Sequence, residues 1–202
     1  MVCINSAMQQ LTTGQRLQLA YRQHISPYSQ FVQCAATLTL KQAATIRVKR
    51  FTNYGNEYYK FTSFLDDDKL HSTIKYFTAQ LTHELYGNHS KHKNKQHWAK
   101  PLIITVVEGR NTHKHTHLHL AIGNIPETHL EKVAQYIQVA FARCDFANEQ
   151  ICVKPVSDSI GWLGYITKEV GYTDNDALDI VGSTIPPFIQ QSICTESRLL
   201  AA

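Results

Sequence analysis

The chain carries near its centre the stretch His115-Thr116-His117-Leu118-His119-Leu120-Ala121-Ile122. Polar and apolar residues alternate in it, which is typical of a half-buried β-strand with one face towards a core. Leu118, Leu120 and Ile122 form the apolar face, and the three histidines share the other. An apolar face is ordinary in such a strand, whereas three aligned imidazoles indicate a chemical role.

The spacing of these histidines limits how they can bind a metal ion. Neighbouring residues on one face of a strand are about 7 Å apart, so two histidines at that spacing can bend onto one ion. His115 and His119 are too far apart to share an ion without His117. We favour the His117/His119 pair over the His115/His117 pair, because it lies deeper in the apolar run. Solvated strand histidines are the alternative in a chain that contains 11 of them.

A third ligand is expected from the preceding strand, Leu102–Glu108, which is rich in β-branched residues. Gly109-Arg110-Asn111 has the composition of a turn, so the two strands should form a hairpin. A loop with an even number of residues would place the Glu108 carboxylate on the histidine face. Two imidazoles and a carboxylate suit Mn²⁺, Zn²⁺ or Mg²⁺ completed by waters. His113 and His115 remain rival third ligands.

Length and composition predict one cytoplasmic domain with extensions. A chain of 202 residues can bury a substantial core, and its net charge of +4 does not by itself identify a nucleic-acid partner. The five cysteines are scattered without a CxxC pair, which indicates a reducing compartment and no thiolate zinc site. We expect neither a signal peptide nor a membrane-spanning segment.

Two further segments are candidates for contacts with nucleic acid. Residues 91–100 concentrate cations beside an aromatic, which can hold phosphates and stack a base, or can form a solvated loop. The candidate contacts in that segment are Lys91, Lys93, Lys95 and Trp98. Residues 46–64 are rich in Tyr, Phe and Thr, and they predict either a loose hairpin or a long excursion that faces DNA. The sequence does not distinguish these two alternatives.

The order of the expected elements is strand, helix, strand, strand, helix, strand, helix. This order fits an α+β fold with a ferredoxin-like split βαβ antiparallel sheet, with helices on one face and the other face open. Residues 1–30 are expected to be an N-terminal extension, residues 31–172 the domain, and residues 173–202 a C-terminal tail that docks or wraps.

The last expected helix, which begins at Ser159, presents a tyrosine and a lysine together. At about 100° per residue, an apolar stripe forms along one side of this helix. The stripe comprises Ile160, Leu163, Ile166 and Val170. Tyr165, Lys168 and Tyr172 fall on the opposite side, away from the core. An ordinary amphipathic surface helix is the alternative interpretation.

Three motifs in this order resemble those of the HUH endonucleases of rolling-circle replication, conjugation and transposition. Thr37-Leu38-Thr39 resembles their first-strand motif, and His117-Leu118-His119 resembles their metal motif of histidine, hydrophobic residue, histidine. Tyr165-Ile166-Thr167-Lys168 resembles the YxxK motif of single-tyrosine replication initiators. The resemblance covers roughly residues 31–172 and implies the HUH endonuclease fold.

By this resemblance, Tyr165 is the nucleophile that attacks a phosphodiester of single-stranded DNA, leaving a free 3′-OH and a 5′-phosphotyrosine link. A divalent ion, Mg²⁺ or Mn²⁺, would polarise the phosphate, and Lys168 would hold a phosphate oxygen. The implied metal ligands are His117, His119 and Glu108. Tyr172 is a weaker second candidate for the nucleophile.

The resemblance further implies a replication initiator of a plasmid, phage or related mobile element. Its partner would be single-stranded DNA at a replication origin, which can include a hairpin, and Thr37 and Thr39 are expected DNA contacts. The sequence contains no GxxxxGK[ST] phosphate loop, so a separate helicase is expected. A transposase or a relaxase of the same superfamily remains an alternative.

Two other classes of protein fit the sequence less well. A non-catalytic ferredoxin-like module that binds nucleic acid would need aromatics on the open face of its central strands, where this chain has threonine and histidine. A hydrolase of the metallo-β-lactamase type would need HxHxDH, but Leu120, Ala121 and Ile122 follow His119.

Overall fold

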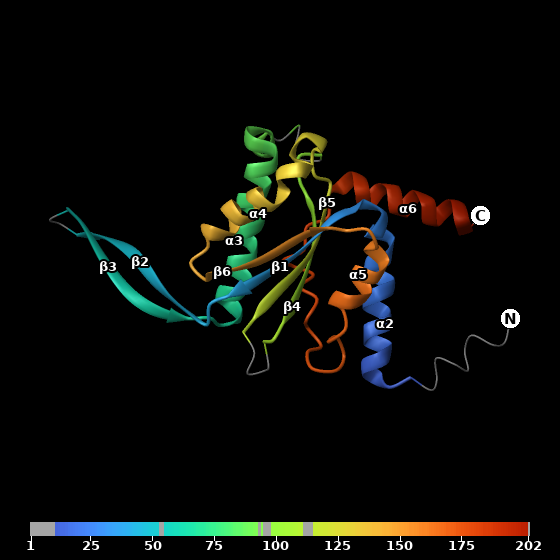
Figure 1. The fold of residues 1–202 in the computed structure, drawn as a ribbon, viewed down its shortest axis with the longest axis horizontal. Coiled ribbons are helices and arrows are strands. Elements are labelled where there is room, and N and C mark those ends of the chain that lie inside the picture. Colours follow the sequence, from blue (N-terminus) through green and yellow to red (C-terminus); the bar gives the residue numbers. More distant parts are fainter. Residues whose placement is uncertain (1–10, 53–54, 93, 95–97, 111–114, 202) are drawn as a thin grey trace.

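The computed structural model describes residues 11–52, 55–92, 94, 98–110 and 115–201. Its centre is a four-stranded antiparallel sheet with the strand order β4-β5-β1-β6 (Figure 1). The strands are β1 (Val32–Leu40), β4 (Leu102–Glu108), β5 (His117–Gly123) and β6 (Ala147–Pro155). The α+β class is confirmed, and the sheet is consistent with a ferredoxin-like arrangement.

Helices precede, connect and follow these strands in the described part of the chain. They are α2 (Thr13–Ile25), α3 (Asp67–Tyr86), α4 (Val133–Ala142), α5 (Ser159–Ile166) and α6 (Pro187–Ala201), with short 3₁₀ segments η1 (Ser26–Phe31), η2 (Gly87–Lys91) and η3 (Glu127–Lys132). The Asp66 side chain accepts a hydrogen bond from the Lys69 backbone N–H and caps α3. Gly87 ends this helix with a φ of 55°. Among the described residues, no helix combines the length and apolar character that a bilayer crossing requires.

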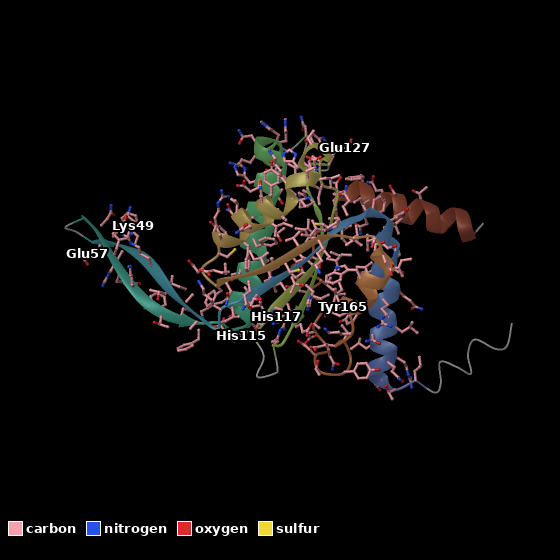
Figure 2. All side chains as sticks on the ribbon, in the orientation of Figure 1. Lys49, Glu57, His115, His117, Glu127 and Tyr165 are labelled. Carbon is pink, nitrogen blue, oxygen red and sulfur yellow. The ribbon has the colours of Figure 1, made fainter. Side chains whose placement is uncertain are left out.

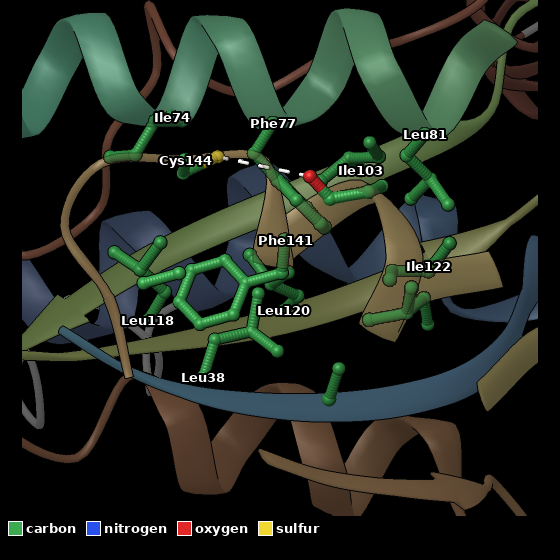
Figure 3. Packing of buried hydrophobic residues seen from close by; sticks show 14 of the residues in the cluster. Leu38, Ile74, Phe77, Leu81, Ile103, Leu118, Leu120, Ile122, Phe141 and Cys144 are labelled. Atoms are coloured by element: carbon green, nitrogen blue, oxygen red, sulfur yellow. Dashed lines mark hydrogen bonds between the residues drawn. The ribbon is translucent and has the colours of Figure 1, made fainter. Parts of the chain in front are cut away.

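The first core lies between the sheet and the pair α3 and α4. The apolar face of the central stretch, Leu118, Leu120 and Ile122, is fully buried there beside Leu38 of β1 (Figure 3). The helices supply Ile74, Phe77, Leu81 and Phe141 to the same cluster. The rings of Phe77 and Phe141 meet edge to face, with centroids 5.9 Å apart. This core fixes the strand register that presents the histidines on the other face.

The second face of the sheet is not open, so the prediction of helices on one face only is wrong. A second buried cluster covers this face and joins Val106 and Ala121 of the sheet to apolar side chains from both ends of the chain. Those side chains are Ile25 and Tyr28, Leu163 and Ile166 of α5, Val170, Ala177, Leu178 and Ile189. The reason is that the strands keep apolar residues on the histidine face too, and α2, α5 and the segment after residue 172 bury them.

The segment between β1 and α3 is a hairpin, as one of the two alternatives predicts. Strands β2 (Ala43–Thr52) and β3 (Gly55–Phe64) form a separate two-stranded sheet. Figure 1 shows that this hairpin, which we call the arm (residues 43–64), projects away from the main body. Ala44 and Ser63 at its root are buried, whereas most of its other described side chains face solvent.

The C-terminal segment closes the outer edge of β4. The backbones of Ile103 and Thr184 exchange two hydrogen bonds, at 2.8 and 2.7 Å. The Asp179 N–H donates to the Thr105 carbonyl at 2.9 Å, and the Val107 N–H donates to the Ala177 carbonyl at 2.7 Å. Residues 177–184 therefore dock along the edge strand that carries Glu108 at its end.

Candidate active site

The two histidines of the central motif stand directly opposite two threonines. The register of β1 and β5 pairs Thr37 with His119 and Thr39 with His117. Each threonine Oγ1 lies within hydrogen-bond distance of the Nδ1 of its partner, at 3.0 Å for His119 and 3.1 Å for His117. Such contacts fix the orientation of an imidazole ring and leave its Nε2 for another partner.

Glu108 lies on the histidine face, as the hairpin argument predicts. The loop between β4 and β5 has an even number of residues, 109–116, and Glu108 pairs with His117. Its Oε2 lies 2.6 Å from His119 Nε2, and both side chains are largely buried. Gly109 starts the loop with a φ of 87°, and a Cβ there would come within 2.7 Å of the His115 carbonyl oxygen.

Tyr165 and Lys168 reach the same place from α5 and the turn after it. Lys168 Nζ donates to the Tyr165 hydroxyl at 3.1 Å and lies 3.1 Å from Glu108 Oε2. A continuous set of contacts therefore joins the tyrosine hydroxyl, the lysine ammonium, the Glu108 carboxylate and the His119 imidazole. Tyr165 remains 48% exposed, so its hydroxyl is accessible from outside. Figure 2 labels Tyr165 on α5 and His117 on the neighbouring strand β5.

The helical wheel is correct for Leu163 and Ile166, which are buried, but wrong for Ile160, which is exposed; Val170 is buried as expected but lies beyond the end of the helix. The helix ends at Ile166, so the residues beyond it do not continue the wheel. Lys168 still reaches the tyrosine because its side chain folds back across the turn. Tyr172 lies in this later turn, is 63% exposed, and does not occupy the helical position predicted for it.

Aromatic packing holds the Tyr165 ring in place. The ring stacks on Trp162, with centroids 5.4 Å apart, and meets His119 edge-on at 5.9 Å. Trp162 is itself fixed to the central strand, because its Nε1 donates to the Leu120 carbonyl at 3.2 Å. Since the tyrosine is held through its ring, its hydroxyl is not needed for this packing.

Helix α2 braces the turn that carries Lys168. Gln18 Nε2 donates to the carbonyls of Thr167 and Lys168, at 2.9 and 3.0 Å. The Arg22 guanidinium donates to Thr167 Oγ1 and to the Gly164 carbonyl, at 3.2 and 3.1 Å. Sequence reasoning missed both residues, because only tertiary packing brings them to residues so distant along the chain.

Burial and neighbouring groups shift the pKa values of Glu108, His119 and Lys168. Burial would raise the pKa of Glu108, but hydrogen bonds from Lys168 and His119 lower it below its usual value. Burial lowers the pKa of His119, and the hydrogen bond to Glu108 only partly opposes this. For Lys168, burial acts to lower the pKa, but the contacts with Tyr165 and Glu108 raise it. At neutral pH the site therefore holds a carboxylate, a neutral imidazole and an ammonium.

The donor set has the chemistry of a divalent metal site: a carboxylate and imidazoles held through Nδ1. Among the residues that the structure describes, however, no three His, Cys, Asp or Glu side chains are arranged to enclose an ion. Glu108 and His119 contact each other directly instead. His115 precedes β5 and is exposed, and His113 lies outside the described residues.

Thr37 and Thr39, which we expected to contact DNA, both hydrogen-bond to the histidines through their hydroxyls. Thr39 is only 4% exposed, whereas Thr37 is partly exposed. The structure thus gives both threonines a role in orienting the imidazoles, and their contact with DNA stays a prediction.

The described residues of the basic segment 91–100 lie away from the histidines. It precedes Leu102, which pairs with Gly123, whereas the other end of β4 pairs with His117. A seven-residue strand spans roughly 20 Å, so Lys91 and Trp98 lie at the opposite end of the sheet from the site. Trp98 packs against the rings of Tyr86 and His89. Lys93 and Lys95 lie outside the described part of the chain.

The chain matches no protein-family model, no curated protein and no solved structure in three separate comparisons. The function of the chain is therefore inferred from its motifs and from the contacts that join them.

Proposed function

We propose that this protein is an HUH-type endonuclease, a metal-dependent and site-specific nickase and strand transferase of single-stranded DNA. The observation that carries the proposal is the accessible Tyr165 hydroxyl, bound by Lys168, which in turn contacts Glu108 beside His119. An ordinary exposed tyrosine on a surface helix needs no lysine that bridges its hydroxyl to a largely buried carboxylate and imidazole.

In the proposed reaction, the Tyr165 oxygen attacks the phosphorus of a phosphodiester as the phenol passes its proton to water. The bond to the 3′ oxygen breaks, this oxygen takes up a proton from water, and the 5′ phosphate stays esterified to the tyrosine. Lys168 holds a non-bridging phosphate oxygen in place. A divalent ion held by His117, His119 and Glu108 would add charge stabilisation on the same oxygens. Because the tyrosyl ester keeps a phosphoester bond, attack by a 3′-OH can rejoin the strand.

We propose a biological role as a rolling-circle replication initiator of a plasmid, phage or related mobile element. The substrate would be single-stranded DNA at a replication origin, and a separate helicase would supply it. In support, the chain has no phosphate loop, so it should cleave without unwinding the duplex itself.

The direct test is incubation of the purified protein with single-stranded oligonucleotides and Mn²⁺ in the absence of ATP. We expect cleavage products and a covalent protein–DNA species on a denaturing gel, and no cleavage of a closed duplex. A protein that binds DNA under all these conditions without a covalent species would support the non-catalytic module instead. Hydrolysis of ATP by the purified protein would contradict the predicted dependence on a separate helicase.

Replacing Lys168 with alanine should slow cleavage without preventing it. Loss of one charged hydrogen bond typically costs about 1.5–3 kcal/mol, which corresponds to roughly a 10- to 150-fold lower rate. Single-turnover cleavage rates of the parent and the Lys168→Ala variant measure the effect, and Lys168→Arg is the matched control that keeps the charge. An unchanged rate in Lys168→Ala would remove this lysine from the mechanism.

A further inference from the structure

The arm has two chemically different faces. In an antiparallel pair, directly opposed residues share a face and adjacent residues along a strand point to opposite faces. The register therefore places the odd-numbered residues of β2 on the same face as the even-numbered residues of β3. We call this the basic face, and its cations and aromatics are Arg47, Lys49, Phe51, Tyr58, Lys60 and Phe64.

The basic face carries positive charge that no acid on the arm neutralises from the same side. The single carboxylate of the arm, Glu57, pairs with Arg50 on the opposite face. On the basic face, Arg47 lies over the Tyr58 ring at 4.2 Å and Lys49 lies over the Phe51 ring at 4.8 Å. Cations and rings therefore lie next to one another on one exposed surface.

The rings are exposed far beyond what a hairpin needs for its own packing. Phe51 is 78% exposed, Phe64 is 71% exposed and Tyr58 is 54% exposed. Exposed rings interleaved with cations are the surface that single-stranded nucleic acid uses, because its bases can stack while its phosphates meet the charges. A duplex offers phosphates but keeps its bases stacked on one another, so it leaves these rings without partners.

The root of the arm borders the candidate active site. Gln42, just before β2, donates through Nε2 to Thr116 Oγ1 at 3.4 Å, and its carbonyl accepts from the Leu65 N–H at 2.8 Å. Thr116 directly precedes His117. Figure 2 shows Lys49 and Glu57 far out along the arm, with His115 and His117 near its root. Ten-residue strands extend roughly 30 Å, so the arm can hold nucleotides well away from the cleaved bond.

We propose that the basic face of the arm binds single-stranded DNA and leads it to the site of Tyr165. The choice of DNA over RNA rests on the proposed function, whereas the choice of a single strand rests on the exposed rings and cations of the arm. The arm then contributes affinity and position along the strand, and it takes no part in the chemical step.

Adjacent residues on opposite faces supply a matched pair of variants. The double variant Lys49→Ala with Tyr58→Ala removes one cation and one ring from the basic face. The double variant Arg50→Ala with Tyr59→Ala removes one cation and one ring from the other face. Fluorescence anisotropy with a labelled single-stranded oligonucleotide in EDTA measures binding to the full chain without cleavage. Circular dichroism tests whether each variant keeps the fold. If the double variant of the basic face does not fold, Lys49→Glu alone tests the contribution of its charge.

We expect the basic-face variant to lose about 10-fold or more in affinity, and the opposite-face variant to stay within about twofold. Loss of one cation should also lower the slope of log affinity against log salt concentration by about 0.7. Equal losses in both variants, no loss in either, or tighter binding of a duplex or of RNA would overturn the inference.

The same experiment separates this inference from the proposed function. Face-dependent binding of DNA without any cleavage would support the role of the arm and remove the nickase. Cleavage with unchanged affinity in the basic-face variant would support the nickase and overturn the role of the arm.

Discussion

Replacing Tyr165 with phenylalanine is expected to abolish both nicking and the covalent adduct. The variant keeps the ring, its stack on Trp162 and its edge contact with His119, and loses only the hydrogen bond from Lys168. That bond is partly exposed and typically contributes about 1 kcal/mol, so the melting temperature and the affinity for DNA should change little. Gel analysis of adducts, thermal melting and anisotropy on the same preparation measure the three quantities.

Tyr172→Phe is the matched control, because Tyr172 is also exposed but lies in the turn beyond α5. We expect this variant to retain a clear fraction of adduct formation. Mapping of the peptide that carries the DNA identifies the attacking residue directly, and attachment at Tyr172 would overturn the assignment of Tyr165.

Replacing His119 with alanine should abolish cleavage that depends on Mn²⁺, together with the rise in melting temperature that the metal causes. The substitution removes the Nε2 that contacts Glu108 and the ring that borders Tyr165. His117→Ala should have the same consequence. Cleavage assays and thermal melting with and without Mn²⁺ test both variants, and full activity in His119→Ala would eliminate the metal site.

A milder change separates metal binding from loss of a buried ring. Thr37→Val keeps the His119 imidazole and removes the hydroxyl at its Nδ1. Loss of such an orienting partner typically weakens metal affinity about 10- to 100-fold, so the Mn²⁺ concentration needed for cleavage should rise. His115→Ala is the control, because His115 is exposed and precedes β5. A higher Mn²⁺ requirement in that control would indicate a ligand in the loop.

The geometry of single strands and short loops was sufficient to predict the central strand and the position of Glu108 beside the histidines. Alternation in the central stretch predicted β5, and loop parity predicted that Glu108 lies on the face of His117, because both depend only on strand geometry. The cap of α3 at Asp66 and its end at Gly87 follow equally local chemistry.

The contacts of α2 with the turn after α5, and the second core, depend on packing between segments that are distant in the sequence. The contacts of Gln18 and Arg22 with the turn after α5 join segments that no periodicity relates. The second core could not be predicted for the same reason, since it collects isolated apolar residues from both ends of the chain. The sequence could not decide between a hairpin and a long excursion for residues 46–64. Most described side chains of the arm are exposed, so burial imposes little pattern on its sequence.

The docking of residues 177–184 along β4 bears on how far the chain can be shortened. Without them, β4 would present unpaired backbone N–H and C=O groups along a strand whose buried residues, Leu102–Val107, are apolar except for Thr105. Exposed apolar edges of this kind recruit strands from other molecules and seed aggregation. A fragment cut at residue 172 would keep every residue of the proposed chemistry, and we expect it to aggregate through this edge. The C-terminal segment thus occupies the position along β4 that a strand of another chain would otherwise take.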